Sequence, residues 1–246
     1  MKEIKITDGE RKEGSFFYLT KSIAPLVNDF GGKIIESHEK RSEARVFSPL
    51  CHYDLFRREI EDKIGDIITI KYKYDYFKRN LHVVGLSDIE KEILYFVLIS
   101  ADLEDDKRYV LRRLKAFKEF SIDGIFNFRL IPLKRKWEEV VSCIPSFFTK
   151  KNLYDFANYV VSEKRNKRVI VDDGKVYDGN YNLLNKRCLI GEREGCEVVK
   201  EVLLSSCNSV DVKGELDTLD EKYLKIFFGR GISFSTQNDK TVYRKF

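Results

Sequence analysis

The spacing of apolar residues changes from a helical to a strand period near Lys167, and this change constrains the fold class most strongly. Before it, apolar residues that follow Thr149 recur at i, i+3, i+4, i+7 and i+8, which is typical of an amphipathic helix. After it, Arg168–Asp172 and Lys175–Tyr177 are joined by an Asp-Gly dipeptide, which predicts a β-hairpin. Strands and helices that follow a helical middle predict an α+β fold.

The first fifty residues predict a strand, a helix and a hairpin. Ile4 and Ile6 have strand spacing, and a helix-spaced run extends from Phe16 to Phe30. Pro25 lies inside this run and is expected to kink or shorten the helix, because its ring clashes with the preceding turn. The hairpin is expected to comprise Ile34-Ile35, the polar turn Glu39–Glu43 and Val46-Phe47.

The stretch from Asp54 to Arg79 fits both periods. Ile68, Ile70 and Tyr72 alternate with polar residues as in a half-buried strand. Apolar residues from Phe56 onward nevertheless keep helical spacing into the same stretch. A helix accounts for more residues and is our prediction, and a strand at Ile67–Tyr74 is the alternative.

The middle of the chain predicts four helices. Ser87 and Glu90 form a capping-box pattern ahead of the apolar run Ile93–Ile99, which predicts a helix central in the core. The other three are expected at Glu104–Glu119, from Ser121 toward Val141 with a kink or break at Pro132, and after Thr149.

The last third predicts a small α/β unit that begins with the hairpin. Its later elements are expected to be a helix with Val198–Leu203, a strand at Ser209–Val212, a helix that starts at Thr218 with a capping box to Glu221 and stops at Gly229, and a strand at Ile232–Ser235. We therefore expect three regions that pack together: an N-terminal α+β region (1–83), a central helical bundle (84–166) and a C-terminal α/β region (167–246).

The net charge of +5 permits an anionic partner, and it is concentrated in the middle of the chain. Residues 81–168 carry 17 basic and 13 acidic side chains, whereas residues 169–246 carry 12 and 13. Arg108, Arg112 and Lys115 share one face of the expected second helix, and they are our candidate contacts for a polyanion or another partner. The alternative is that i, i+4 pairs such as Glu104 with Arg108 simply solvate that face.

The motifs of several enzyme classes are missing. The sequence has no GxSxG elbow, no phosphate-binding GxxxxGK[ST] loop and no complete GxGxxG pattern. Its three histidines have no HExxH context, and its five cysteines show no CxxC spacing. We therefore expect a non-enzyme with no cofactor and no metal.

The compartment is expected to be the cytoplasm. The first ten residues, MKEIKITDGE, have no basic start followed by an apolar core, as a secretory signal would have. The longest apolar run, Ile93–Ile99, is far shorter than the roughly 20 residues of a membrane span. An odd number of widely spaced cysteines also fits reduced thiols.

The heptapeptide GIFNFRL (Gly124–Leu130) places Arg129 beside two aromatic residues. We expect Arg129 to form a structural ion pair, with Asp123 or Glu138 as the partner. If the heptapeptide opens a central helix, Phe128 is expected to pack in the core.

The order of several segments resembles that of the YtxC-like sporulation proteins of endospore-forming Firmicutes. The resemblance covers roughly residues 55–236 and rests on DIEKEILYFVL, a basic helix, SIDGIFNFRL, KRKWEEVV, VIVDDGKVY and FFGRGISF, with Gly124–Leu130 as its most specific part. Pro132, Pro145 and the segment VVSEKRNKRV depart from the family pattern, which implies a divergent member.

The resemblance implies a role in sporulation rather than a reaction. We therefore expect a non-enzymatic cytosolic sporulation protein that acts through an unknown macromolecular partner. The alternative is a nucleic-acid-binding protein that uses the basic helical middle.

Overall fold

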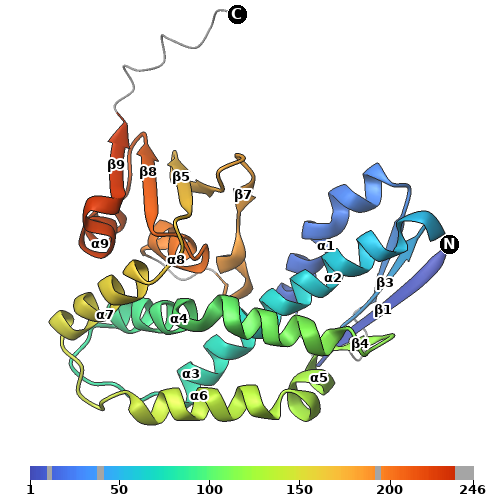
Figure 1. The fold of residues 1–246 in the computed structure, drawn as a ribbon, viewed down its shortest axis with the longest axis horizontal. Coiled ribbons are helices and arrows are strands. Elements are labelled where there is room, and N and C mark those ends of the chain that lie inside the picture. The colour runs from blue at the N-terminus through green and yellow to red at the C-terminus, as the bar shows by residue number, and fades with distance from the viewer. Residues whose placement is uncertain (10–12, 38–41, 192–194, 236–246) are drawn as a thin grey trace, which may run out of the picture. The chain divides into compact units, whose positions relative to one another are not determined.

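The computed structural model describes residues 1–9, 13–37, 42–191 and 195–235, which form two compact units. Unit 1 comprises Met1–Asn80, Glu104–Ile144 and Cys188–Gly191. Unit 2 comprises Leu81–Leu103, Pro145–Arg187 and the described residues between 195 and 235. The α+β fold class is confirmed (Figure 1).

The division into units differs from the three consecutive regions expected at 1–83, 84–166 and 167–246. The reason is α4 (Asp88–Leu114), a single helix whose residues up to Leu103 belong to unit 2 and whose residues from Glu104 belong to unit 1. The separate helix expected at Glu104–Glu119 is therefore wrong. Its residues continue α4 as far as Leu114.

Unit 1 contains a four-stranded sheet of order β2-β3-β1-β4. Its strands are β1 (Lys2–Asp8), β2 (Lys33–Ser37), β3 (Ser42–Ser48) and β4 (Phe120–Ser121), and all neighbours are antiparallel except β1 and β4. Ile4 and Ile6 are buried, whereas Lys5 between them forms an ion pair with Glu43 on β3. The predicted strand and hairpin are confirmed, although part of the expected turn Glu39–Glu43 lies outside the described residues.

The helix α1 (Glu13–Asp29) passes through Pro25. The expected shortening at this residue is wrong, because the helix continues to Asp29 and Gly31 follows with φ +68°. Pro25 is exposed, while Ile23 and Val27 on either side of it are buried. Packing of these neighbours maintains the helix.

The ambiguous stretch is helical throughout, so the alternative of a strand at Ile67–Tyr74 is wrong. It is covered by α2 (Tyr53–Asp66), η2 (Ile67–Tyr72) and α3 (Lys73–Asn80), and the short 3-10 helix η1 (Leu50–His52) precedes it. The η2 segment is a π-helix, whose wider turn breaks the 3.6-residue period. Ile64 to Tyr74 are buried except for Lys71, so this helix lies in the core of unit 1.

The next helices of unit 1 are α5 (Ile122–Arg129) and α6 (Ile131–Cys143). The expected break is confirmed, because the chain leaves the helix at Leu130 and Pro132 lies in the first turn of α6. Proline is tolerated there because the first amides of a helix have no intrahelical partner.

The capping box at the start of α4 is confirmed in unit 2. The Ser87 amide donates to the Glu90 carboxylate at 2.9 Å, and the Glu90 amide lies 3.4 Å from Ser87 Oγ. Buried side chains from Ile93 to Ile99 place this part of α4 in the core, as predicted. None of the described helices is long and apolar enough to cross a membrane.

Unit 2 also contains a five-stranded sheet of order β7-β6-β5-β8-β9. The strands of this sheet are β5 (Arg168–Asp172), β6 (Lys175–Tyr177), β7 (Leu183–Leu184), β8 (Ser209–Lys213) and β9 (Ile232–Ser235). The helices of this part of the chain are α7 (Lys150–Ser162), η3 (Lys186–Leu189), α8 (Glu197–Leu204), α9 (Thr218–Phe228) and η4 (Gly229–Gly231). The last two residues of η3 belong to unit 1. Strands β5, β8 and β9 are parallel, and the β5–β6 hairpin is antiparallel, as predicted.

Valines that lie opposite each other in β5 and β8 form the apolar face of this sheet. Val169 pairs with Val210 and Val171 with Val212, and all four are buried. The expected capping box at Thr218 is wrong, because Asp217 is the N-cap of α9 and accepts from the Leu219 amide at 2.8 Å. The predicted stop at Gly229 is confirmed, with φ +48°.

Candidate functional site

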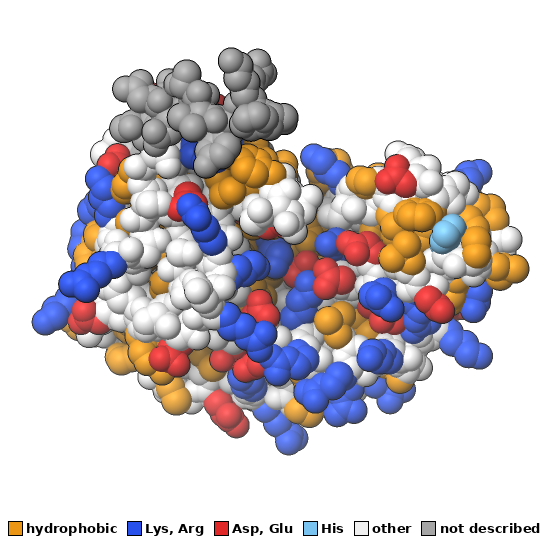
Figure 2. Space-filling view, turned by 45° about the horizontal axis from the view of Figure 1, so that its top comes forward, with side chains coloured by type: hydrophobic (Ala, Val, Ile, Leu, Met, Phe, Trp, Pro, Cys, Tyr) orange, Lys and Arg blue, Asp and Glu red, His pale blue; other side chains and the backbone are white. Residues whose placement is uncertain are grey.

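The charge distribution is most one-sided between Lys107 and Trp137, a stretch that we call the basic segment. It contains ten Lys and Arg residues and only two acidic residues, Glu119 and Asp123. The whole segment belongs to unit 1 and runs from the end of α4 through α5 into α6. Figure 2 shows many Lys and Arg side chains along the lower part of the face that it draws.

The three candidate contacts are all exposed, but they do not all lie on a helix. Arg108 and Arg112 are one turn apart on α4, whereas Lys115 follows the helix end at Leu114. Arg108 pairs with Asp105 at 3.0 Å, and not with Glu104 as the spacing suggested. Both partners are more than half exposed, and such pairs contribute little to stability.

Two cations of the basic segment form ion pairs with carboxylates of unit 1 instead. Lys107 Nζ lies 2.8 Å from carboxylate oxygens of both Asp62 and Asp66. Burial would lower the pKa of Lys107, but these two carboxylates outweigh it and hold the pKa above its ordinary value. Lys136 Nζ lies 2.8 Å from Asp106.

Six other cations are exposed and form no ion pair with any residue that the structure describes. They are Arg112, Arg113, Lys115, Lys118, Arg129 and Arg135. Arg112 and Arg113 also lie in the last turn of α4, where positive charge favours the helix dipole. That role accounts for these two cations and leaves the other four unexplained.

Phe128 is 76% exposed, so the expected core position is wrong. Its place is taken by Phe126, which is 7% exposed and stacks on Trp137 with ring centroids 5.6 Å apart. Residues two apart on a helix point about 200° apart, so these two phenylalanines do not share a face. This spacing was visible in the sequence, and it was the signal that the prediction missed.

The expected ion pair of Arg129 is also wrong. Arg129 is exposed and contacts neither Asp123 nor Glu138 within the described part of the chain. The Asp123 carboxylate instead accepts from Ser121 Oγ at 3.0 Å. Because α5 ends at Arg129, the guanidinium extends into solvent.

Residues 127–135, all of them exposed except Leu130, Leu133 and Lys134, form what we call the α5–α6 corner. Lys134 Nζ donates to Asn127 Oδ1 at 3.0 Å and lies 4.5 Å from the centroid of the Phe126 ring. These contacts tie α6 to α5, while Phe128 and Ile131 remain exposed at the corner. The corner thus presents an aromatic ring and cations where the two helices contact each other.

A second cluster of polar groups surrounds η2, but it is buried. Asp66 accepts from Tyr18 Oη at 2.9 Å, Tyr72 Oη donates to Asp8 at 2.5 Å, and Lys73 Nζ lies 2.7 Å from Asp106. Burial and the facing carboxylates raise the pKa of both tyrosines well above the ordinary value. A ligand in solvent does not reach these groups, so we assign them to packing.

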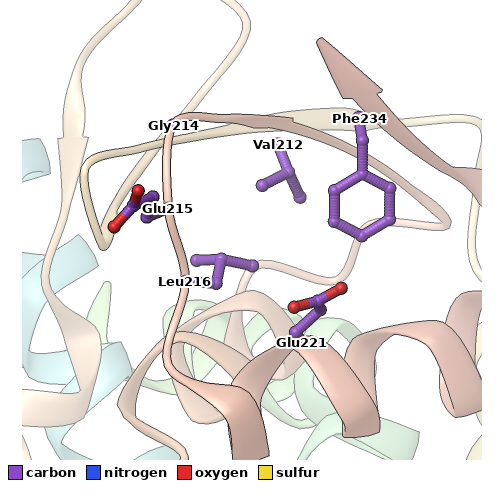
Figure 3. A pocket seen from close by; sticks show the side chains of 6 residues that line it. All are labelled: Val212, Gly214, Glu215, Leu216, Glu221 and Phe234. Atoms are coloured by element: carbon purple, nitrogen blue, oxygen red, sulfur yellow. The ribbon is translucent and has the colours of Figure 1, made fainter. Parts of the chain in front are cut away.

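Unit 2 has a hollow of about 310 Å³ at the ends of β8 and β9 (Figure 3). It is lined by Val212, Gly214, Glu215, Leu216, Glu221 and Phe234. Glu215 and Glu221 lie on opposite sides of Leu216 in Figure 3, and Glu221 forms an ion pair with Lys225. The described residues contain no group of three or more side chains suited to a metal, and His38 lies outside them.

In comparisons with family models, curated proteins and solved structures, nothing matches this chain.

Proposed function

We propose that this protein binds nucleic acid through the basic segment. One observation supports the proposal most: six exposed Lys and Arg side chains have no ion-pair partner among the described residues, and only two acidic residues lie in the same segment. Surface cations are ordinarily interspersed with acidic side chains, which reduce their field. A phosphate backbone supplies the missing negative charge.

The proposal assigns the main phosphate contacts to Arg108, Arg112 and Lys115. Arg108 belongs with the other two because its partner Asp105 is itself exposed, so the pair can be exchanged for a phosphate at little cost. Phosphate contacts release counterions, and the log-log salt slope on duplex DNA is about −0.9 for each neutralised phosphate. Three contacts therefore account for a slope of roughly −3.

A titration with a fluorescein-labelled oligonucleotide at two salt concentrations tests the proposal. The variant Arg108→Glu/Arg112→Glu/Lys115→Glu should lose binding at low salt. The matched control is Lys2→Glu/Lys21→Glu/Lys33→Glu, which makes the same change of net charge at exposed positions of unit 1 outside the basic segment. Equal loss in both variants, or no binding by the unmodified protein at low salt, contradicts the proposal.

We also propose sporulation as the pathway, with the cytoplasm as the compartment. This part is supported by the order of segments that resembles the YtxC-like family, and the nucleic acid would be the expected macromolecular partner. The proposal includes no catalytic step. Deletion of the gene in a spore-forming host should lower spore yield or resistance, and unchanged spores contradict the pathway.

A further inference from the structure

We infer that Phe128 is a stacking platform for an unpaired base, so that the nucleic acid bound at the basic segment is single-stranded. This inference rests on the proposed function and specifies its substrate class. Phe128 is 76% exposed, although it lies in a helix that is anchored by a buried phenylalanine two residues earlier. The ring is therefore held away from the core by the geometry of α5.

The residues around Phe128 suit a nucleic-acid backbone. Between Gly124 and Trp137 the sequence has four Lys and Arg residues and no Asp or Glu. Arg129 and Arg135 are exposed, and Lys134 of α6 donates a hydrogen bond to Asn127 of α5. Phosphates on either side of a stacked base would thus find the cations Arg129 and Arg135 near the ring in sequence.

The exposed ring favours a single strand over a duplex. In a duplex the bases stack on each other and the outer surface is phosphate and sugar. An exposed aromatic ring therefore adds no affinity for a duplex beyond that of the cations. In a single strand every base has a free face, and each base stacked on an aromatic side chain contributes affinity with little dependence on sequence. Basic residues beside an exposed aromatic ring are the combination that such binding uses.

The test compares single-stranded DNA of about 20 nucleotides, longer than one binding site, with the same sequence annealed to its complement. Phe128→Ala should weaken single-strand binding roughly 5- to 150-fold and leave duplex binding unchanged. Phe128→Trp should retain single-strand binding, because the ring face is preserved. Phe17→Ala is the matched control: Phe17 is 60% exposed on α1, outside the basic segment, with Lys21 Nζ 5.3 Å from its ring.

The outcomes separate this inference from the proposed function. If Phe128→Ala leaves single-strand affinity unchanged while the Arg108, Arg112 and Lys115 variant abolishes binding, the stacking role is wrong and nucleic-acid binding stands. Equal loss of single-strand and duplex affinity in Phe128→Ala also overturns stacking. If neither form of DNA binds at low salt, both proposals are wrong and the exposed ring belongs to a protein contact.

Discussion

The Lys73 ammonium lies 2.7 Å from a carboxylate oxygen of Asp106, and both side chains are buried. The same carboxylate accepts from Trp137 Nε1 at 3.0 Å and pairs with Lys136 at 2.8 Å. It therefore joins α3 to α4 and α6. A buried charge is tolerated only with such partners, so this contact fixes how three segments of unit 1 pack.

Asp106→Asn should destabilise unit 1 by about 3 to 5 kcal/mol, because it removes the full negative charge that faces buried Lys73. Lys73→Met should cost less, since Asp106 keeps Lys136 and the indole of Trp137. Trp137 is the only tryptophan and is buried in unit 1, so urea unfolding followed by its fluorescence measures both effects. A larger cost for Lys73→Met would contradict this assignment.

The stability of unit 1 should decrease at acidic pH, because the Asp106 carboxylate becomes protonated there. Burial would raise the pKa of Asp106, but Lys73 and Lys136 outweigh it and hold the pKa below its ordinary value. A depressed pKa gives stabilisation that is present above about pH 4, the pKa of an unfolded aspartate, and is lost as the pH falls through the folded pKa. Urea titrations from neutral pH to about pH 3 should therefore show a shallower decline for Asp106→Asn than for the unmodified protein. Parallel declines would assign the acid sensitivity to other carboxylates.

Two phenylalanines of α5 should respond oppositely to truncation. Phe126→Ala should cost about 3 to 5 kcal/mol, because it leaves a cavity against Trp137 and Tyr72. Phe128→Ala should change the free energy of unfolding by no more than about 0.5 kcal/mol, since the ring is exposed. Urea unfolding of both variants measures the difference, and a similar cost for the two would mean that α5 is rotated from the orientation described.

The N-cap of α9 can be identified by a pair of substitutions. Asp217→Ala should cost about 1 kcal/mol, because the Leu219 amide loses the side-chain acceptor at the helix start. Thr218→Ala should cost less, as Thr218 already lies inside the helix. Thermal unfolding followed by circular dichroism compares them. The reverse order would restore the capping box at Thr218 that the sequence suggested.

The cysteines should differ in reactivity toward a thiol reagent. Cys51 and Cys143 are exposed and should react in the folded protein. Burial raises the pKa of Cys196 to about 12 and of Cys207 to about 11, which leaves little thiolate at neutral pH. These two should react only after unfolding. Mass spectrometry of the labelled protein locates each site, and rapid labelling of Cys207 in the folded state would contradict its burial.

The sequence by itself determined the type and order of most elements. Periodicity identified β1, the hairpins and the helices, because a strand or helix with one buried face repeats its apolar residues at a fixed interval. Two helix ends could also be predicted from the sequence, because each depends on residues within one turn. They are the capping box of Ser87 and Glu90 and the helix stop at Gly229. The basic middle of the chain was visible as well, because charge is a property of composition.

Only the tertiary structure decided which phenylalanine of α5 is buried and which cations of the basic segment remain without an ion pair among the described residues. Lys107 and Lys136 look like the other cations of the basic segment, but carboxylates from distant segments pair with them. Phe128 has the same side chain as Phe126, and only the packing of α5 against Trp137 made one of them core and the other surface. Pairing and burial depend on residues far away in the chain, whereas periodicity describes only neighbours.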